Sequence, residues 1–266
     1  MEGGKKRLAV LVGCNYPNTS NELHGCINDV LTMRDTLVKR FGFDPSNVQL
    51  LTDAPGSAAM PTGANIKKAL AEMVDQAKAG DVLFFHYSGH GTRIPSLRPG
   101  HPFRQDEAIV PCDFNLITDL DFRQLVNRLP KRSKLHNSFR LLPYFDIGTH
   151  LLEFFGADAS LRFRLPLLEL DNFMELLRPD EGILLSGCQS NETSADMNPM
   201  MSGGMAYGAF SNAVQMVLKD NLCQLSNKEV VIMARKMLEA KGIEQHPCLY
   251  CSDENAGATF LWQPQS

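Results

Sequence analysis

Short, largely apolar runs alternate with helical repeats in the first third of the chain. The runs at 8–12, 48–51 and 81–86 predict buried strands. Between them, apolar residues recur at helical spacing over 22–40 and over about 65–79. Because the loops between these segments are short, the order strand, helix, strand, helix, strand predicts a parallel sheet with helices on both faces.

The pattern is less regular in the remaining two thirds. Thr118 and Asp119 predict the start of a helix over 120–128. Pro143 interrupts the apolar stretch 138–145, so this stretch can supply only a few residues of a central strand. Further elements of both kinds are expected: strands at 108–112, 182–188, 249–251 and 258–261, and helices at 150–155, 167–177, 207–218 and 228–240.

Composition and charge narrow the class of protein. A chain of 266 residues that is 44% hydrophobic can form one large α/β domain or two small ones. A net charge of -4 does not favour binding to nucleic acid or to a membrane surface. No apolar stretch reaches 18 residues, and the N-terminus does not read as a secretory signal. Seven cysteines without a disulfide-type spacing indicate reduced thiols, so we expect a cytoplasmic protein.

His90 is the sharpest candidate for chemistry, because it lies between two glycines directly after a predicted strand. Ligands of parallel sheets bind at the carboxyl ends of the strands, where a histidine can act as a general base. The backbone N–H of Gly91 can then serve as an oxyanion donor. The alternative is a structural histidine in a tight turn. His86 lies within the strand and is expected to be buried and hydrogen-bonded.

Cys26 and Asp29 are three residues apart, which places them on one face of the first helix. Beside an apolar stripe near the strand ends, Asp29 can form the floor of a pocket for a cationic side chain. Ser88 can complete that pocket from the strand. From the spacing alone, a solvated helix acid is the more ordinary interpretation of Asp29.

No metal or cofactor is expected. The His-x-Cys-x2-Cys cluster at 246–251 lacks the second pair of ligands that a structural zinc site requires. Asp106, Asp119 and Asp121 are weak calcium candidates, because they do not follow the spacing of a calcium-binding loop. The segment 13–15 is not a dinucleotide-binding glycine motif.

Several long motifs closely resemble plant type II metacaspases, which are caspase-like cysteine peptidases. The resemblance covers about residues 5–130 and 146–262, and one of its motifs is His-Tyr-Ser-Gly-His-Gly-Thr at 86–92. The other matching segments are 7–17, 22–30, 106–113, 146–152, 186–189, 192–196, 206–212 and 246–253.

The resemblance implies a caspase-like three-layer α/β sandwich with a mostly parallel central sheet. It implies a single domain over 1–266, with a large-subunit-like part at 1–130, a divergent junction at 131–145 and a small-subunit-like part at 146–266. The implied activity is that of a monomeric endopeptidase that cuts proteins and peptides after Arg or Lys, with no nucleic-acid or membrane partner.

The resemblance also assigns roles to residues. His90 becomes the catalytic histidine, and Cys26, Asp29 and Ser88 become walls of the acidic pocket that takes the basic side chain. The acidic loop of calcium-dependent relatives is replaced here by the basic segment 93–104, so calcium dependence is doubtful.

One departure from the family is specific. The family carries its nucleophile in Asp-Ser-Cys-His-Ser-Gly-Gly, on a central strand after the helix that ends near residue 130. Here the sequence passes through 131–145 without that motif and rejoins the family pattern at Asp146. We therefore expect a missing central strand and an inactive or strongly impaired peptidase, or alternatively a catalytically silent binding or regulatory protein. Cys26 is the one plausible substitute nucleophile, although a structural role for it is favoured.

Overall fold

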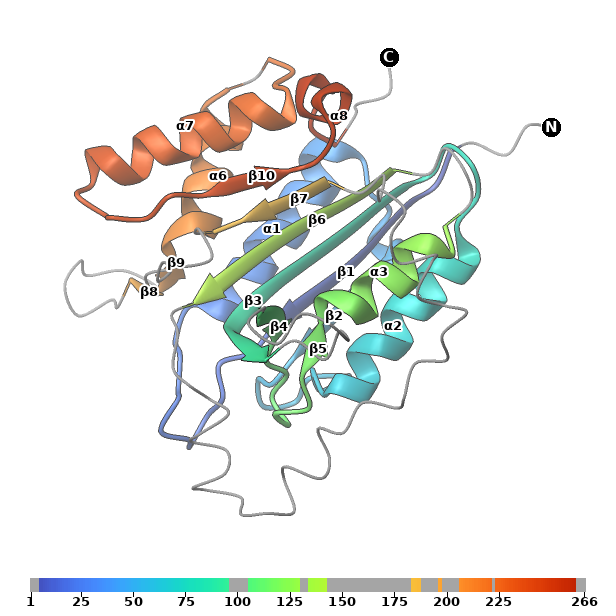
Figure 1. Cartoon of the computed structure of the whole chain (residues 1–266), viewed down its shortest axis with the longest axis vertical. Coiled ribbons are helices and arrows are strands. Elements are labelled where there is room, and N and C mark those ends of the chain that lie inside the picture. The colour runs from blue at the N-terminus through green and yellow to red at the C-terminus, as the bar shows by residue number, and fades with distance from the viewer. Residues whose placement is uncertain are drawn as a thin grey trace.

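The computed structural model of the chain describes residues 5–95, 105–129, 134–142, 183–187, 196–197, 206–221 and 223–261. The main sheet has the strand order β10–β7–β6–β3–β1–β2 (Figure 1). Its neighbouring strands run parallel, except that β10 is antiparallel to β7. The strands are β1 (Arg7–Gly13), β2 (Val48–Thr52), β3 (Val82–Pro95), β6 (Lys134–Leu142), β7 (Ile183–Ser186) and β10 (Cys248–Tyr250).

Helices cover both faces of this sheet (Figure 1). Successive residues of β1 explain why, because Ala9 and Leu11 join one apolar cluster whereas Val10 and Val12 join the other. The first cluster is shared with α1 (Cys26–Phe41), α6 (Ala209–Asp220) and α7 (Asn227–Ala240), and the second with α2 (Gly63–Gln76) and α3 (Asp119–Asn127). The predicted α/β architecture, with helices on both faces of a mostly parallel sheet, is confirmed.

The predicted helix signals are also found in the structure. Thr118 caps α3 through a reciprocal pair of hydrogen bonds with Asp121. Residues 258–261 were expected to form a strand, but only an isolated bridge joins Thr259 to Ser226 there, after the short helix α8 (Asp253–Gly257). The helices expected at 150–155 and 167–177 lie outside the described residues.

β3 does not end at the histidine motif, as its sequence suggested. Its residues up to Ser88 pair with β1, and those up to His90 pair with β6. From Gly91 onward the same strand pairs antiparallel with β4 (Gln105–Ile109), which in turn pairs with β5 (Ile117–Thr118). Around the glycines of this motif the backbone of β3 stays extended, but its pairing changes from β1 and β6 to β4.

The sheet has no empty position between β3 and β7, contrary to the expectation of a missing central strand. β6 fills this position, and its residues pair from Lys134 opposite Val82 to Leu142 opposite His90. All nine paired residues precede Pro143, which lies outside the described residues. The apolar junction segment thus supplies a longer strand than the proline implied.

A second, two-stranded sheet joins β8 (Asp196–Met197) to β9 (Tyr207–Gly208), directly before α6. None of the helices in the described ranges combines the length and the apolar character that a membrane span requires.

Candidate functional site

The candidate residues gather at the carboxyl edge of β1 and β3. Gly13 at the end of β1 pairs with Ser88, and the N–H of Cys14 donates to the Ser88 carbonyl over 2.9 Å. The loop that follows leads into α1, so this edge receives side chains from a strand, a loop and the first turn of a helix. Such an edge is where ligands of parallel sheets bind.

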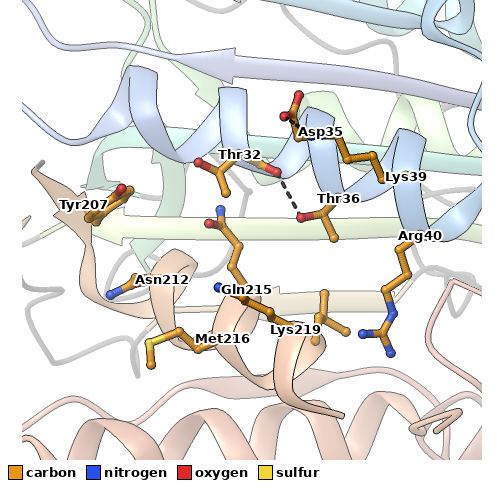
Figure 2. Close-up of a pocket in the computed structure, with 11 residues that line it drawn as sticks. Thr32, Asp35, Thr36, Lys39, Arg40, Tyr207, Asn212, Gln215, Met216 and Lys219 are labelled. Carbon is orange, nitrogen blue, oxygen red and sulfur yellow. Dashed lines mark hydrogen bonds and ion pairs between the residues drawn. The ribbon is translucent and has the colours of Figure 1, made fainter. Parts of the chain in front are cut away.

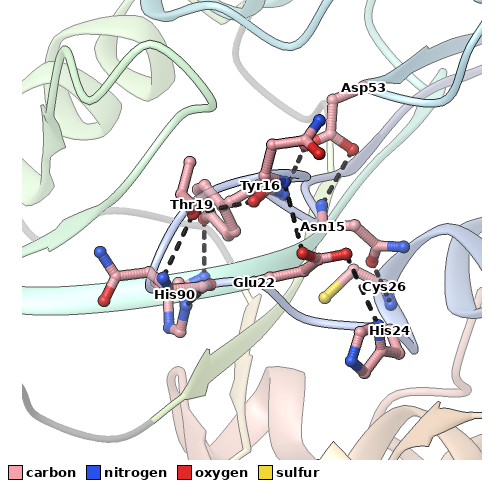
Figure 3. Close-up of polar contacts among 10 residues, drawn as sticks. Asn15, Tyr16, Thr19, Glu22, His24, Cys26, Asp53 and His90 are labelled. Carbon is pink, nitrogen blue, oxygen red and sulfur yellow. Dashed lines mark hydrogen bonds and ion pairs between the residues drawn. The ribbon is translucent and has the colours of Figure 1, made fainter.

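The His90 imidazole is held by a backbone carbonyl. Its Nε2 lies 2.7 Å from the carbonyl oxygen of Asn21, and its ring packs against Tyr16 with centroids 4.8 Å apart (Figure 3). A carbonyl oxygen only accepts hydrogen bonds, so Nε2 carries the proton. In the neutral ring the lone pair therefore lies on Nδ1, which is the nitrogen suited to act as a base.

Two buried tyrosines fix the main chain of His90. Its N–H donates to the Tyr16 hydroxyl over 2.8 Å, and the Tyr87 hydroxyl donates to its carbonyl over 2.9 Å. The two hydroxyl oxygens lie 2.9 Å apart. A Cβ at Gly89 would lie 2.5 Å from the Tyr87 oxygen and 2.8 Å from the Tyr16 oxygen, so only glycine fits there. Burial raises the pKa of both tyrosines well above the ordinary value, which keeps both hydroxyls protonated.

Gly91 is the first residue of the hairpin with β4. It pairs with Ile109, and the N–H of Val110 donates to the His90 carbonyl over 3.0 Å. The N–H of Gly91 therefore belongs to a strand that continues past His90. Its role as an oxyanion donor stays a prediction.

Asp53 organises the loop between β1 and α1, and the sequence interpretation missed it. Its carboxylate accepts the N–H groups of Asn15 and Tyr16 over 2.9 and 2.7 Å (Figure 3). The Asn15 side chain in turn accepts the N–H of Cys26 over 3.0 Å, at the start of α1. Asp53 follows the end of β2, and a polar residue at the carboxyl end of a third parallel strand was the signal that could have found it.

Asp29 and Ser88 are in direct contact, and their role as walls of a substrate pocket stays a prediction. The Ser88 hydroxyl donates to the Asp29 carboxylate over 2.7 Å, and both residues are fully buried. The N–H of Gly208, the residue that caps α6, also donates to this carboxylate over 3.0 Å. Asp29 is therefore not a solvated helix acid, because it joins α1, β3 and the positive end of α6.

A cavity of about 510 Å³ lies between α1 and α6 (Figure 2). Gln215 lines it and donates to the Asp29 backbone carbonyl over 3.1 Å. Its cations Lys39, Arg40 and Lys219 stand in the last turns of the two helices, where positive charge offsets the helix dipole.

Cys26 is fully buried on the Asp29 face of α1. Its neighbour Cys14 has a pKa raised well above the ordinary value, mainly by burial and further by Asp53 and Cys26. Burial also raises the pKa of Cys112 to about 11. Cys14 and Cys112 are thus held as thiols at neutral pH and are poor nucleophiles. The role of Cys26 as a substitute nucleophile stays a prediction.

The acidic residues named as weak calcium candidates make structural contacts. The Asp121 carboxylate accepts the backbone N–H of Thr118 at the start of α3, and its Oδ1 lies 2.8 Å from the Lys67 Nζ. The Asp119 Oδ2 lies 3.9 Å from the Arg123 Nε. Asp106 is placed by its pairing opposite Ile94, and its side chain lies outside the described part. Within the described ranges, no three His, Cys, Asp or Glu residues gather as a metal site, and this includes the cluster at 246–251.

Comparison with known sequences places two families on this chain. The family described as "Metacaspase, peptidase C14 domain" matches residues 6–140, and the family described as "Caspase domain" matches residues 169–256. Metacaspase-9 of Arabidopsis thaliana is 53% identical over an alignment of 320 residues, which covers 98% of each chain.

Solved structures support the fold. The structure of protein GSU0716 from Geobacter sulfurreducens superposes with a TM-score of 0.69 at 18% identity, covering 97% of this chain and 98% of the other. A pro-sf-caspase-1 structure superposes with a TM-score of 0.53 at 10% identity, covering 94% and 93%. At these identities the likeness concerns the arrangement of sheet and helices alone.

Proposed function

Because the chain belongs to the metacaspase family of caspase-like cysteine peptidases, we propose that its sheet edge is a metacaspase-type substrate site without a nucleophile of its own. The site takes an arginine or lysine side chain of a protein substrate. The observation that carries this proposal is the buried Asp29 carboxylate, held by Ser88 at the same edge of the sheet as His90.

The chemistry of the acid supports a basic ligand. A carboxylate at low dielectric attracts a guanidinium or ammonium group more strongly than an exposed one does. Ser88 and Gly208 fix the Asp29 oxygens, so the acid is oriented before a ligand arrives. The proposed pocket residues are fully buried in this conformation: Cys26, Asp29 and Ser88. A ligand can therefore reach Asp29 only if the residues that cover it move.

The absence of the nucleophile is supported by register and by length. The family's nucleophile follows α3 on the strand beside β3, and here that strand is β6, with Leu142 opposite His90. The alignment with metacaspase-9 spans 320 positions, 54 more than the 266 residues of this chain, so at least that many positions have no counterpart here. Loss of a protease nucleophile lowers turnover by roughly 10⁶-fold.

His90 remains the proposed general base and Gly91 the proposed oxyanion donor. Without a thiol at the adjoining strand end, these groups position a scissile bond but do not cleave it efficiently. The second candidate function is a catalytically silent protein that binds basic peptides or a family partner. It is favoured by the buried Asp29 carboxylate together with the proposed lack of a nucleophile on β6. Measurable turnover separates the two.

The decisive experiment compares binding and hydrolysis of one arginine-containing peptide. Wild type is expected to bind the peptide. Hydrolysis faster than that by His90→Ala would identify a strongly impaired peptidase, and equal hydrolysis would identify the catalytically silent protein. Asp29→Asn should weaken binding by about tenfold or more, because it removes the charge but keeps an acceptor. Asp35→Asn is the matched control: it removes a charge from an exposed position of the same helix and should bind like wild type. Circular dichroism checks that each variant is folded.

Equal binding by Asp29→Asn and wild type would refute the pocket. Hydrolysis that disappears in Cys26→Ala would show that Cys26 is the nucleophile and would refute the absence of one. Hydrolysis that survives that substitution would eliminate Cys26 and point to another thiol.

A further inference from the structure

The hydrogen bond between His90 and Asn21 joins two separate segments of the chain. His90 lies on β3, and Asn21 lies in the loop between β1 and α1. The geometry of this bond depends on how the two segments are held relative to each other. Contacts from Tyr16 reach both of them.

On the His90 side, the contact is made by the Tyr16 side chain. Its hydroxyl accepts the N–H of His90 over 2.8 Å and donates to the Val110 carbonyl over 2.5 Å. Its ring lies against the imidazole. Tyr16, from the loop between β1 and α1, therefore fixes the position of both the backbone and the ring of His90.

On the Asn21 side, the contact is made by the Tyr16 backbone through Thr19. The Thr19 hydroxyl donates to the Tyr16 carbonyl over 2.8 Å, and its oxygen accepts the N–H of Asn21 over 3.2 Å. The Thr19 N–H donates to the same Tyr16 carbonyl over 3.3 Å. The hydroxyl is the group that extends this turn to Asn21, whose carbonyl accepts from the imidazole. Figure 3 shows Tyr16, Thr19 and His90 together.

Tyr16 itself is firmly placed. Its N–H donates to the buried Asp53, and its φ of 51° is the left-handed conformation that a tyrosine rarely adopts. Backbone strain of this kind persists only where surrounding contacts hold it, and it gathers at functional sites.

We propose that Tyr16 and Thr19 are positioning residues that fix the orientation and the tautomer of the His90 imidazole. They hold its main chain and its carbonyl partner in one geometry, so that Nε2 keeps the proton and Nδ1 keeps the lone pair. The inference rests on the proposed role of His90 as the base, and it adds two residues that act through His90.

The test reads the protonation of each ring nitrogen by long-range ¹H–¹⁵N NMR correlation on the full-length, ¹⁵N-labelled protein. The His90 signals are assigned by their loss in His90→Gln. Wild type at neutral pH should show a single tautomer with the proton on Nε2. Thr19→Val removes the hydroxyl and keeps the shape of the side chain, and Tyr16→Phe removes only the hydroxyl.

Both variants should lose the single-tautomer pattern and show the averaged nitrogen shifts of a free imidazole. Tyr250→Phe and Thr32→Val remove the same groups from β10 and from α1, away from His90, and both should retain the wild-type pattern. A purely structural role would lower stability without moving the nitrogen shifts.

A wild-type tautomer in folded Thr19→Val and Tyr16→Phe would overturn the inference, as would averaged shifts in wild type itself. If Tyr16→Phe does not fold, the half-buried Thr19→Val alone decides. Binding of the arginine peptide is measured on the same samples. A wild type that fails to bind refutes the proposed pocket, whereas the nitrogen shifts still decide the positioning role.

Discussion

Asp29 and His90 lie at the same edge of one sheet, but the fold holds them in different ways. Asp29 is held by its carboxylate, which accepts hydrogen bonds from β3 and from the cap of α6. His90 is held mainly by its main chain, through the hydroxyls of Tyr16 and Tyr87. The acid is therefore part of the scaffold as well as of the site, whereas the imidazole can be changed without dismantling the strand that carries it.

The sharpest test of this contrast compares two truncations. Asp29→Ala should lower the free energy of unfolding by about 3 kcal/mol, because it leaves the Ser88 hydroxyl and the Gly208 N–H buried and unpaired. His90→Ala should cost only about 1 kcal/mol, because the main-chain contacts survive. Urea unfolding followed by circular dichroism measures both. Equal losses would show that the two residues do not differ in the way described.

The anchoring of His90 by its main chain predicts an effect one residue earlier. Gly89→Ala should destabilise the protein by about 2 kcal/mol, because the new methyl group overlaps both tyrosine hydroxyls. Gly257→Ala in α8 meets open space and should be nearly neutral in the same urea experiment. If Gly89→Ala were as stable as its control, the hydroxyls of Tyr16 and Tyr87 would not hold the His90 backbone rigidly in place.

The contrast can be sharpened by introducing a thiol on the strand beside β3. Leu142 is in register with His90 on the adjoining parallel strand, so Leu142→Cys introduces a thiol at the strand position opposite His90. A pKa lowered by one unit next to the histidine should speed alkylation by iodoacetamide about tenfold at pH 7, relative to Leu142→Cys combined with His90→Ala. Identical rates in the two variants would mean that the β6 end does not face the imidazole.

The smallest expected effect is a decline of stability in alkali. The pKa values of Tyr16 and Tyr87 are raised in the folded protein, so the stability that they contribute is complete below about pH 10, the value for unfolded tyrosine. Above that pH the unfolded chain loses these protons and the folded protein does not, so stability falls. Absorbance at 295 nm should show two of the five tyrosines ionising only together with unfolding. Early ionisation of all five would contradict the buried pair.

Much of the sheet could be predicted from local pattern. The apolar runs that became β1 and β2 and the helical repeat that became α1 were visible because each buries a regular face. The position of Cys26 and Asp29 on one face of α1 followed from their three-residue spacing alone. The course of β3 beyond His90 could not be predicted, because a strand continues wherever a new neighbour pairs with it.

The site shows the same division. The sequence by itself placed His90 directly after a run of buried strand residues and Asp29 on the first helix, since these positions follow from hydrophobic periodicity. Only the tertiary structure decided that Asp53 and Tyr16 hold the loop beneath them, and that β6 closes the sheet beside β3. The physical reason is that hydrogen bonds across 37 or 74 residues of sequence leave no local pattern, because they form only when the strands are assembled.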